Sequence, residues 1–385
     1  MIFFCIFATE SIKYTKMENE ILKHFESLPE HRQAGKILHP MRNIVFIVLV
    51  GVFNRMEDWE DIADFAEYKR DFFEKYLDLS NGFPSDDTLR RFFAALDSRA
   101  FAACFSQWAA SIVQGTSDKT VCIDGKRIRT ASNMSDTPIH IVSAWVSENQ
   151  MTLAQLKVSD KTNEITAIPQ LIEILDLKGA TVTIDAMGCQ TEIVEKIVDA
   201  KADYVIGLKG NQPSLLEEAL ETAKTFKPDC EIVKTDFGHG RIEDRKYMFY
   251  SDLSCIPSRD RWKGFRQIVR VDTKQTDKKT GVESTDVRYF ITSHKISDAE
   301  KVAECIRRHW GIESMHWSLD VTFDEDSSLK RDRNSAENFN IVRKIVMGVL
   351  KNDGVDYGKK RVSLKRRMLR ASCDEAYLVS LLARL

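Results

Sequence analysis

The feature that most constrains the fold of this chain is a change of hydrophobic period near residue 120. Before it, apolar side chains recur every three or four residues, which predicts helices over 20–25, 42–53, 59–69 and 88–96. After it, short runs rich in β-branched residues predict strands over 121–123, 139–146 and 153–158. The change indicates a helical region followed by a region built on a sheet.

The order of the next elements narrows the choice of sheet. Asn149 and Gln150 form a turn between the second and third strands, so the first three strands predict an antiparallel meander. Helix, strand, helix and strand then follow over 164–175, 181–184, 192–200 and 204–208. This is the element order of a ribonuclease H-like domain, although the pattern alone indicates only an α/β fold with a mixed sheet.

A β-rich stretch interrupts this order after a helix at 215–224. Strand-like runs occupy 231–235, 246–250, 266–271 and 287–292, and helical periodicity returns at Ser297. We therefore expect a helical N-terminal domain at 17–115, a ribonuclease H-like domain at 118–212 and 297–352, a β-rich insertion at 213–296 and a basic helical tail at 353–385. The count starts at Met17 because the preceding residues lack the features of a signal peptide and resemble an over-extended reading frame.

Composition excludes several classes of protein. A chain of 385 residues with 43% hydrophobic and 30% charged residues is long enough for two or three domains and typical of globular proteins. No run approaches the roughly 18 apolar residues that span a bilayer, so we expect no membrane partner. The eight cysteines form no C-x-x-C pair, which argues against a zinc ribbon or disulfide framework and predicts a cytoplasmic protein.

Two acidic residues each follow an apolar strand. Asp124 is followed by Gly125, and Asp185 is followed by Ala186. A carboxylate at the end of a buried strand is costly unless something compensates it, and α/β sheets bind ligands just beyond such ends. Either acid alone is more often a cap or turn residue, but the shared pattern raises the case for a functional pair.

A third acid lies on the helix that begins near Ser297. Its residues Val302, Ile306, Trp310, Glu313 and Trp317 share one face. Because that face is otherwise large and apolar, we expect it to pack on the sheet and to direct Glu313 towards the strand ends. The alternative is a glutamate at the edge of the apolar stripe that reaches water.

Ordered segments of the chain resemble the insertion-sequence DDE transposases, in the branch that includes the H-repeat-associated proteins. These segments are IDGKRIR (123–129), KTNEITAIPQLI (161–172), TIDAMGCQ (183–190), GLKGNQ (207–212), HGRIEDR (239–245) and HWGIESMHWSLDVTFDED (309–326). LPEHRQAGKILHP (28–40) and FPSDDTLRRFFAAL (83–96) resemble the associated N-terminal domain of that branch. The resemblance extends from about Phe25 to Lys351.

The resemblance implies a ribonuclease H-like catalytic domain with a β-rich insertion, preceded by an α-helical DNA-binding domain. It implies that Asp124, Asp185 and Glu313 are the catalytic and metal-binding acids, with two Mg²⁺ or Mn²⁺ ions as cofactors. Such hard cations prefer oxygen ligands, and two of them can serve both ends of an in-line phosphodiester displacement. The implied partner is double-stranded DNA, both the terminal inverted repeats and the target, bound by a homodimer in a nucleoid-associated complex.

One departure from the wider superfamily affects the DNA contacts. Where that superfamily often has Tyr-x-x-Arg before its glutamate and a lysine seven residues after it, this chain has Ile306, His309 and Asp320. His309 and His316 share a helical stripe with Glu313, and we interpret them as DNA-facing or ligand-supporting groups. We expect phosphate contacts from Lys126, Lys209, Asn211, His239, Arg241, Arg245 and His309, each of which is equally compatible with a turn or surface residue.

The segment 329–370 is strongly basic, with 13 Lys and Arg against 4 Asp and Glu. It predicts phosphate contacts along a helix, and the alternative is a solvated surface. The candidates are Lys330, Arg331, Arg333, Arg343 and Lys344. In the insertion Trp262 lies among basic residues, and related hairpin-forming transposases suggest that it stacks on a flipped base.

The sequence therefore predicts a metal-dependent transposase that cleaves element ends and joins the freed 3′-hydroxyl to target DNA. Three alternatives remain open: a catalytically inactive or domesticated DNA-binding descendant, a nuclease of the same fold that joins no strands, and a structural protein without a DNA role. Short inverted repeats flanking the gene would favour the transposase.

Overall fold

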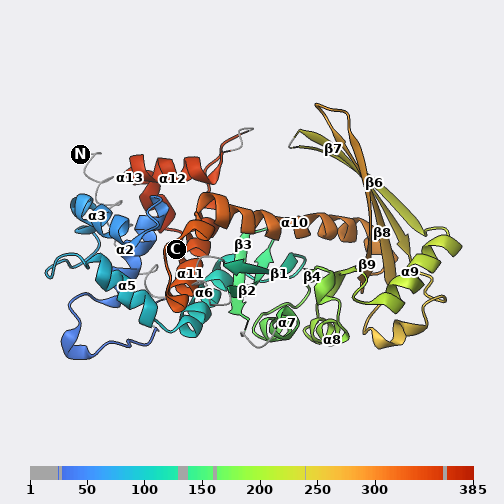
Figure 1. Ribbon diagram of the computed structural model, residues 1–385, viewed down its shortest axis with the longest axis horizontal. Coiled ribbons are helices and arrows are strands. Elements are labelled where there is room, and N and C mark those ends of the chain that lie inside the picture. The colour runs from blue at the N-terminus through green and yellow to red at the C-terminus, as the bar shows by residue number, and fades with distance from the viewer. Residues whose placement is uncertain (1–24, 26–27, 129–137, 159–162, 239, 359–361) are drawn as a thin grey trace, which may run out of the picture.

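A single mixed sheet organises the structure. The computed structural model describes residues 25, 28–128, 138–158, 163–238, 240–358 and 362–385, and the expectation about residues 1–16 lies outside them. The strand order is β3-β2-β1-β4-β5-β9-β8-β7-β6 (Figure 1). The first five strands are β1 (Thr120–Ile128), β2 (Ile139–Val146), β3 (Met151–Lys157), β4 (Thr181–Ile184) and β5 (Asp203–Leu208).

The pairing of these five strands is that of a ribonuclease H-like sheet. β1, β2 and β3 form the antiparallel meander, and β4 and β5 add to β1 in parallel. Every residue of β4 is buried, as expected for a parallel strand covered on both faces. The α/β fold class predicted from the sequence is confirmed.

Helices cover both faces of the sheet. On one face lie α7 (Glu164–Glu173) and α8 (Thr191–Asp199), and on the other α10 (Ala299–Thr322) crosses β1, β4 and β5 (Figure 1). A further helix, α9 (Pro213–Thr225), lies between β5 and the first of the inserted strands. Short 3₁₀ helices occupy Ala34–Lys36, Ala186–Gly188, Pro257–Arg261, Ile296–Asp298 and Glu325–Ser327.

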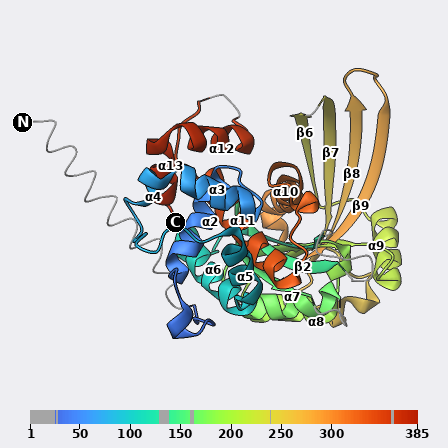
Figure 2. The same ribbon diagram turned by 60° about the vertical axis from the view of Figure 1, so that its left-hand side comes forward.

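The inserted strands extend the same sheet. β9 (Glu283–Thr292) pairs antiparallel with β5, and β8 (Gln267–Asp277), β7 (Arg241–Tyr250) and β6 (Cys230–Gly238) follow outward. Near β5 they pack on α10 through a core that includes Val205, Tyr247 and Val302. Farther out the strands project from the molecule as an arm (Figure 2). There Phe237 is 70% exposed.

The N-terminal helices share a core with the sheet. They are α2 (Met41–Phe53), α3 (Trp59–Tyr68), α4 (Arg70–Phe73), α5 (Asp86–Ala95) and α6 (Ser98–Val113). α11 (Arg333–Lys351) packs against α2, α5, α6 and β3 and is buried from Ser335 to Leu350. α12 (Leu364–Cys373) and α13 (Glu375–Leu382) close this end. No helix within the described ranges is long and apolar enough to cross a membrane.

Candidate active site

The parallel pairing of β1 with β4 brings two of the predicted acids to one place. Ile123 pairs with Ile184, so Asp124 and Asp185 follow paired positions on neighbouring strands. The Asp185 carboxylate accepts hydrogen bonds from the backbone N–H groups of Met187 (2.9 Å) and Gly188 (3.4 Å). Asp124 accepts one from the N–H of Gly125 at 2.9 Å. β1 continues to Ile128, so Asp124 lies within its strand and not after it as expected, whereas Asp185 follows the last residue of β4.

Glu313 approaches the pair from α10, whose predicted apolar face meets the sheet only in part. Val302 and Ile306 of that face are buried, but farther along the helix the buried residues are Ile312, Met315 and Leu319. Glu313 is exposed, and Trp317, predicted to pack on the sheet, is 61% exposed. Contrary to expectation, Glu313 lies at the edge of the apolar stripe. Its exposed carboxylate can therefore act electrostatically on Asp124.

The charges around Asp124 are uncompensated. Burial raises the pKa of Asp124 to about 7, and the hydrogen bond from Gly125 only partly opposes this. Neighbouring carboxylates raise the pKa further, and these belong to Asp185, Glu164 and Glu313. The carboxylates of Asp185 and Glu313 therefore both add negative charge to the surroundings of Asp124.

A neutral histidine lies beside this group. His316 Nδ1 is 3.5 Å from Asp124 Oδ2. Burial, followed by the positive charges of Lys344 and Lys126, lowers the pKa of His316 to about 3. His316 therefore brings no charge to offset Asp124, and its buried Nε2 has no hydrogen-bond partner in the described part of the chain.

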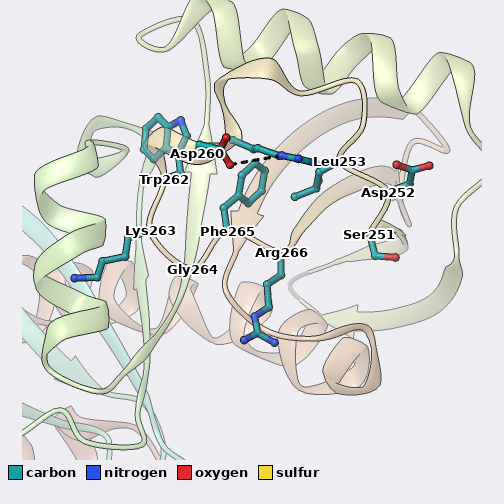
Figure 3. A pocket seen from close by; sticks show the side chains of 10 residues that line it. Ser251, Asp252, Leu253, Asp260, Trp262, Lys263, Gly264, Phe265 and Arg266 are labelled. Carbon is teal, nitrogen blue, oxygen red and sulfur yellow. Dashed lines mark ion pairs between the residues drawn. The ribbon is translucent and has the colours of Figure 1, made fainter.

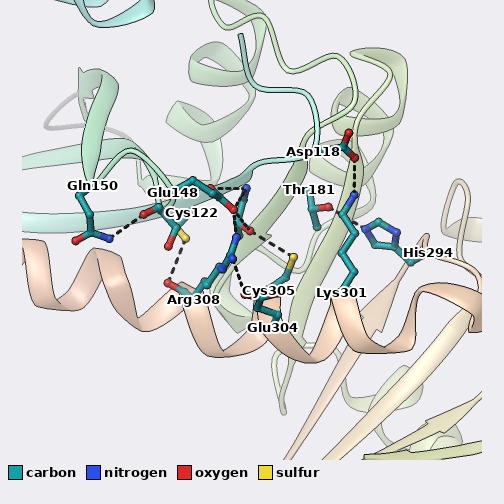
Figure 4. A network of polar contacts seen from close by, with 12 residues as sticks. Asp118, Cys122, Glu148, Gln150, Thr181, His294, Lys301, Glu304, Cys305 and Arg308 are labelled. Atoms are coloured by element: carbon teal, nitrogen blue, oxygen red, sulfur yellow. Dashed lines mark hydrogen bonds and ion pairs between the residues drawn. The ribbon is translucent and has the colours of Figure 1, made fainter. Parts of the chain in front are cut away.

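Polar contacts fix α10 on the sheet (Figure 4). Arg308 forms an ion pair with Glu148, whose carboxylate also accepts hydrogen bonds from the N–H (2.9 Å) and hydroxyl (3.0 Å) of Thr120. One residue farther along α10, His309 Nδ1 is 2.9 Å from the hydroxyl of Thr183. Burial lowers the pKa of His309 to about 4, so its position suits a support for β4 better than the expected phosphate contact.

The donors in the site are of the type that a hard divalent cation prefers. Burial, and after it the negative charges of Asp185, Glu164 and Glu313, raises the pKa of Asp124, and a bound cation would offset both effects. Among the described residues, no three acidic, histidine or cysteine side chains lie close enough together to hold a metal ion. The side chains thus have the oxygen donors that the expected cation requires. Their carboxylates lie farther apart than the ligands of a bound ion.

Two neighbours of Asp124 were not predicted as site residues. Glu164 begins α7, and its Oε1 is 2.6 Å from His140 Nε2 on β2. The segment that contains Glu164 is part of the family resemblance, and this was the available signal. The spacing of residues in the sequence alone does not show that the start of α7 lies beside β1 in the fold.

The predicted DNA contacts next to the acids divide into two kinds. Lys209 is exposed directly after β5. Lys126 is largely buried, with its Nζ 2.6 Å from Asp320 Oδ1 and 2.7 Å from Glu325 Oε2. Asn211 donates a hydrogen bond to the carbonyl of Ala186 at 2.7 Å and so braces the turn after Asp185. Of these three, Lys209 is the most available to a phosphate.

In the arm, the predicted basic contacts are engaged with acids. Arg241 Nε is 2.6 Å from Glu243. Arg245 is buried in ion pairs with Glu243 and Asp236 and lies over the ring of Trp310. This burial argues against a phosphate contact by Arg245. His239 lies outside the described residues.

The basic segment contributes mostly buried side chains. Lys330 donates to the carbonyl of Glu57 and lies over the rings of Trp59 and Phe339. Arg343 donates to Glu57 at 2.8 Å, and Lys344 donates to Ser143 and Gln155. Their burial argues against the predicted phosphate contacts. Arg331 is exposed, and Arg333 is partly exposed.

Trp262 belongs to the core of the insertion. It borders an open surface pocket that is also lined by Arg259, Lys263 and Arg266 (Figure 3). Its side chain is only 4% exposed, and Lys263 is held at 2.5 Å by Asp199 of α8. The burial of the ring argues against the predicted stacking on a flipped base.

Comparison with known proteins agrees with this architecture. A ribonuclease H-like sheet with acids on two neighbouring parallel strands, an inserted β arm and a helical N-terminal region defines the class of fold. The family model described as "Transposase DDE domain" matches residues 115–347, and the one described as "DDE_Tnp_1-associated" matches residues 22–109. The chain belongs to the DDE transposase family.

Two curated relatives, both named as putative transposases, are similar over most of the chain. YncI of Escherichia coli O157:H7 is 36% identical over 92% of this chain and 95% of its own length. The H repeat-associated YhhI of Escherichia coli (strain K12) is 35% identical over 94% of this chain and 98% of its own length. The family resemblance found in the sequence is thereby confirmed.

A solved structure with a similar chain is the synaptic complex of the piggyBac transposase with hairpin DNA. The match has a TM-score of 0.41 and 11% sequence identity and covers 96% of this chain and 78% of that one. A match with so low a TM-score supports no inference about this protein.

Proposed function

We propose that this protein is the DNA transposase of an insertion sequence, which cleaves DNA at the ends of the element and transfers the freed strand into target DNA. The observation that carries the proposal is the position of Asp124 and Asp185 on neighbouring parallel strands, with the Glu313 carboxylate close enough to raise the pKa of Asp124. Membership of the DDE transposase family supports it. The alternative is a catalytically inactive or domesticated DNA-binding descendant.

The carboxylates would hold two Mg²⁺ or Mn²⁺ ions. When bound, such ions supply an activated water and stabilise the leaving oxyanion. Asp185, fixed by two backbone amides, presents its carboxylate from β4. Asp124 must release a proton near neutral pH before it can act as a ligand. Glu313 supplies the third carboxylate from the crossing helix.

The proposal extends to partners and organisation. The substrate is double-stranded DNA, and a homodimer in the DNA complex would hold two element ends at the nucleoid. The chain would divide into the helical N-terminal DNA-binding domain (17–115), the catalytic domain (118–212 and 297–352), the insertion (213–296) and the basic tail (353–385). Exposed Lys209 and Arg331 are the strongest remaining candidates for phosphate contacts.

Strand cleavage by purified variants tests the proposal. With Mg²⁺ and labelled element-end DNA, Asp124→Asn, Asp185→Asn and Glu313→Gln should each lose cutting and joining by a factor on the order of 10³ or more. DNA binding should persist, and double variants should be little worse than single ones, since the acids act as a unit. Excess EDTA should stop the wild type, and Ca²⁺ should support cleavage poorly.

Glu300→Gln is the matched control. It makes the same substitution on the same helix, at an exposed residue that pairs with Lys234 at 2.9 Å. This variant should cut normally. Normal cutting by all three acid variants would exclude the assignment of these residues, whereas no cutting by the wild type would favour the inactive descendant.

A further inference from the structure

We propose that Glu164 is a fourth acidic residue of this site, which supplies a further carboxylate oxygen to the divalent cation at Asp124. The inference rests on the metal-dependent function proposed above and adds a residue to it. Glu164 begins α7, which covers the face of the sheet opposite to α10 (Figure 1). The cation would thus have carboxylate ligands from helices on both faces of the sheet.

The Glu164 carboxylate is held by one side chain. Its Oε1 is 2.6 Å from His140 Nε2, and the two side chains are 15% and 19% exposed. In the described part of the chain His140 is the ion-pair partner of Glu164, and it engages Oε1, which leaves Oε2 for a cation. Carboxylates that bind a metal are themselves hydrogen-bonded by neighbouring groups, which orients them, and His140 can do this for Glu164.

Gly125 provides independent support, because it leaves the space that the pair occupies. A Cβ at this position would lie 2.2 Å from Glu164 Oε1 and 2.6 Å from His140 Nε2. The backbone of Gly125 lies in a strand without a positive φ, so any residue could adopt its conformation. Position 125, directly after Asp124, must therefore lack a side chain.

The placement is electrostatically unfavourable unless a cation is present. The charge of Glu164 adds to the effect of Asp185 and Glu313 on Asp124. A Glu–His pair that served only to fix α7 on β2 would gain nothing from lying beside another carboxylate, because like charges repel. A shared divalent cation turns this repulsion into common ligation.

Mn²⁺ titration calorimetry on the full-length protein tests the inference without reference to activity. Wild type should bind Mn²⁺, and Glu164→Gln should bind it about tenfold more weakly, the size of effect typical of groups that support a metal site. Gly125→Ala should weaken binding as well, since its Cβ displaces the Glu164 carboxylate. Glu173→Gln, at the exposed other end of α7, is the control and should bind as wild type does.

Two results would overturn the inference in distinguishable ways. If Glu164→Gln binds Mn²⁺ as wild type does while Asp124→Asn does not, Glu164 is outside the site and the proposed function stands. If wild type binds no Mn²⁺, both proposals fail. Should Glu164→Gln fail to fold, Fe²⁺ and ascorbate can cut the wild-type backbone beside the bound ion. We expect scission near residue 164 as well as near 124 and 185, and its absence near 164 would overturn the inference.

Discussion

Two groups of charged side chains lie side by side in this molecule and are organised in opposite ways. The first is the acid centre, formed by Asp124, Asp185 and Glu313, in which like charges face one another. The second is a buried charge network in which opposite charges are paired. Its members are Lys126, Glu325, Arg343 and Glu57, and Lys330 adds to it by donating to the backbone carbonyl of Glu57.

The contrast is sharpest on β1, where Asp124 and Lys126 are two residues apart. Lys126 lies 2.7 Å from the fully buried Glu325, which also accepts a hydrogen bond from Asn340 at 2.6 Å. Although burial opposes it, Glu325 and Asp320 raise the pKa of Lys126. Among the described residues, Asp124 has no cationic partner of this kind. Buried ion pairs hold structural elements together, whereas a buried charge without an opposite partner can bind a ligand of the opposite charge.

The network connects three parts of the fold. Glu325 follows α10, Arg343 belongs to α11, and Glu57 lies in the turn between α2 and α3. Arg343 reaches both acids, with its guanidinium 2.8 Å from Glu57 and 3.6 Å from Glu325. The helical N-terminal region is thereby fixed against the strand that carries Asp124.

The largest expected difference between the two groups is in stability. Glu325→Gln removes the fully buried counter-charge that Lys126 and Arg343 share, leaves them with the less buried Asp320 and Glu57, and should lower the free energy of unfolding by about 3–5 kcal/mol. Glu313→Gln, at an exposed residue of the acid centre, should change it by less than about 0.5 kcal/mol. Urea unfolding of both variants measures this. Equal effects would show that the network is no more structural than the acid centre.

A smaller effect is expected in the pH dependence of the metal-free protein. Folding raises the pKa of Asp124 from 3.8 to about 7, so the folded state favours the protonated carboxyl. The resulting penalty is absent below about pH 4, grows as pH rises and is complete above about pH 7. It amounts to at most roughly 4 kcal/mol, since one pKa unit is about 1.4 kcal/mol.

The measurement is the difference between wild type and Asp124→Asn, in EDTA, at several pH values. Comparing the two cancels other groups, such as Lys344, whose pKa burial lowers to about 7. Asp124→Asn should become the more stable protein as pH rises from 5 to 8. A constant difference across this range would contradict the picture of an uncompensated Asp124.

The sequence predicted the fold, and it pointed to Asp124 and Asp185 as candidates, because local patterns suffice for both. The change of hydrophobic period marked the start of the sheet, and an acid after a run of apolar residues marked Asp124 and Asp185. The pattern did not show that β1 continues past Asp124 to Ile128, and only the parallel pairing of β1 with β4 brings the two positions together.

The predictions that fared worst depended on neighbours far away in the sequence. Lys330 looks like a surface charge until Glu57, 273 residues earlier, appears beside it. α11 reads as a basic stripe, yet the N-terminal helices cover one side of it and β3 the other. On α10 the periodicity identified an apolar stripe but not which side of the helix would meet the sheet. Glu164 and His140 likewise meet only through the folded sheet.

The smallest expected effect separates exposed from buried charge within the basic segment. Arg331 is exposed, whereas Lys344 is fully buried between β2 and β3 and donates to Ser143 at 2.8 Å and Gln155 at 2.7 Å. Each phosphate contact that is lost lowers the slope of log affinity against log salt by about 0.9. Arg331→Ala should therefore flatten the salt dependence of DNA binding by about one unit. Lys344→Met, which keeps the length of the side chain, should leave the slope unchanged as long as the protein is folded. A flatter slope for Lys344→Met with no change for Arg331→Ala would mean that α11 turns its buried face to DNA, and the distinction between paired structural charge and charge left for a ligand would then fail for this part of the molecule.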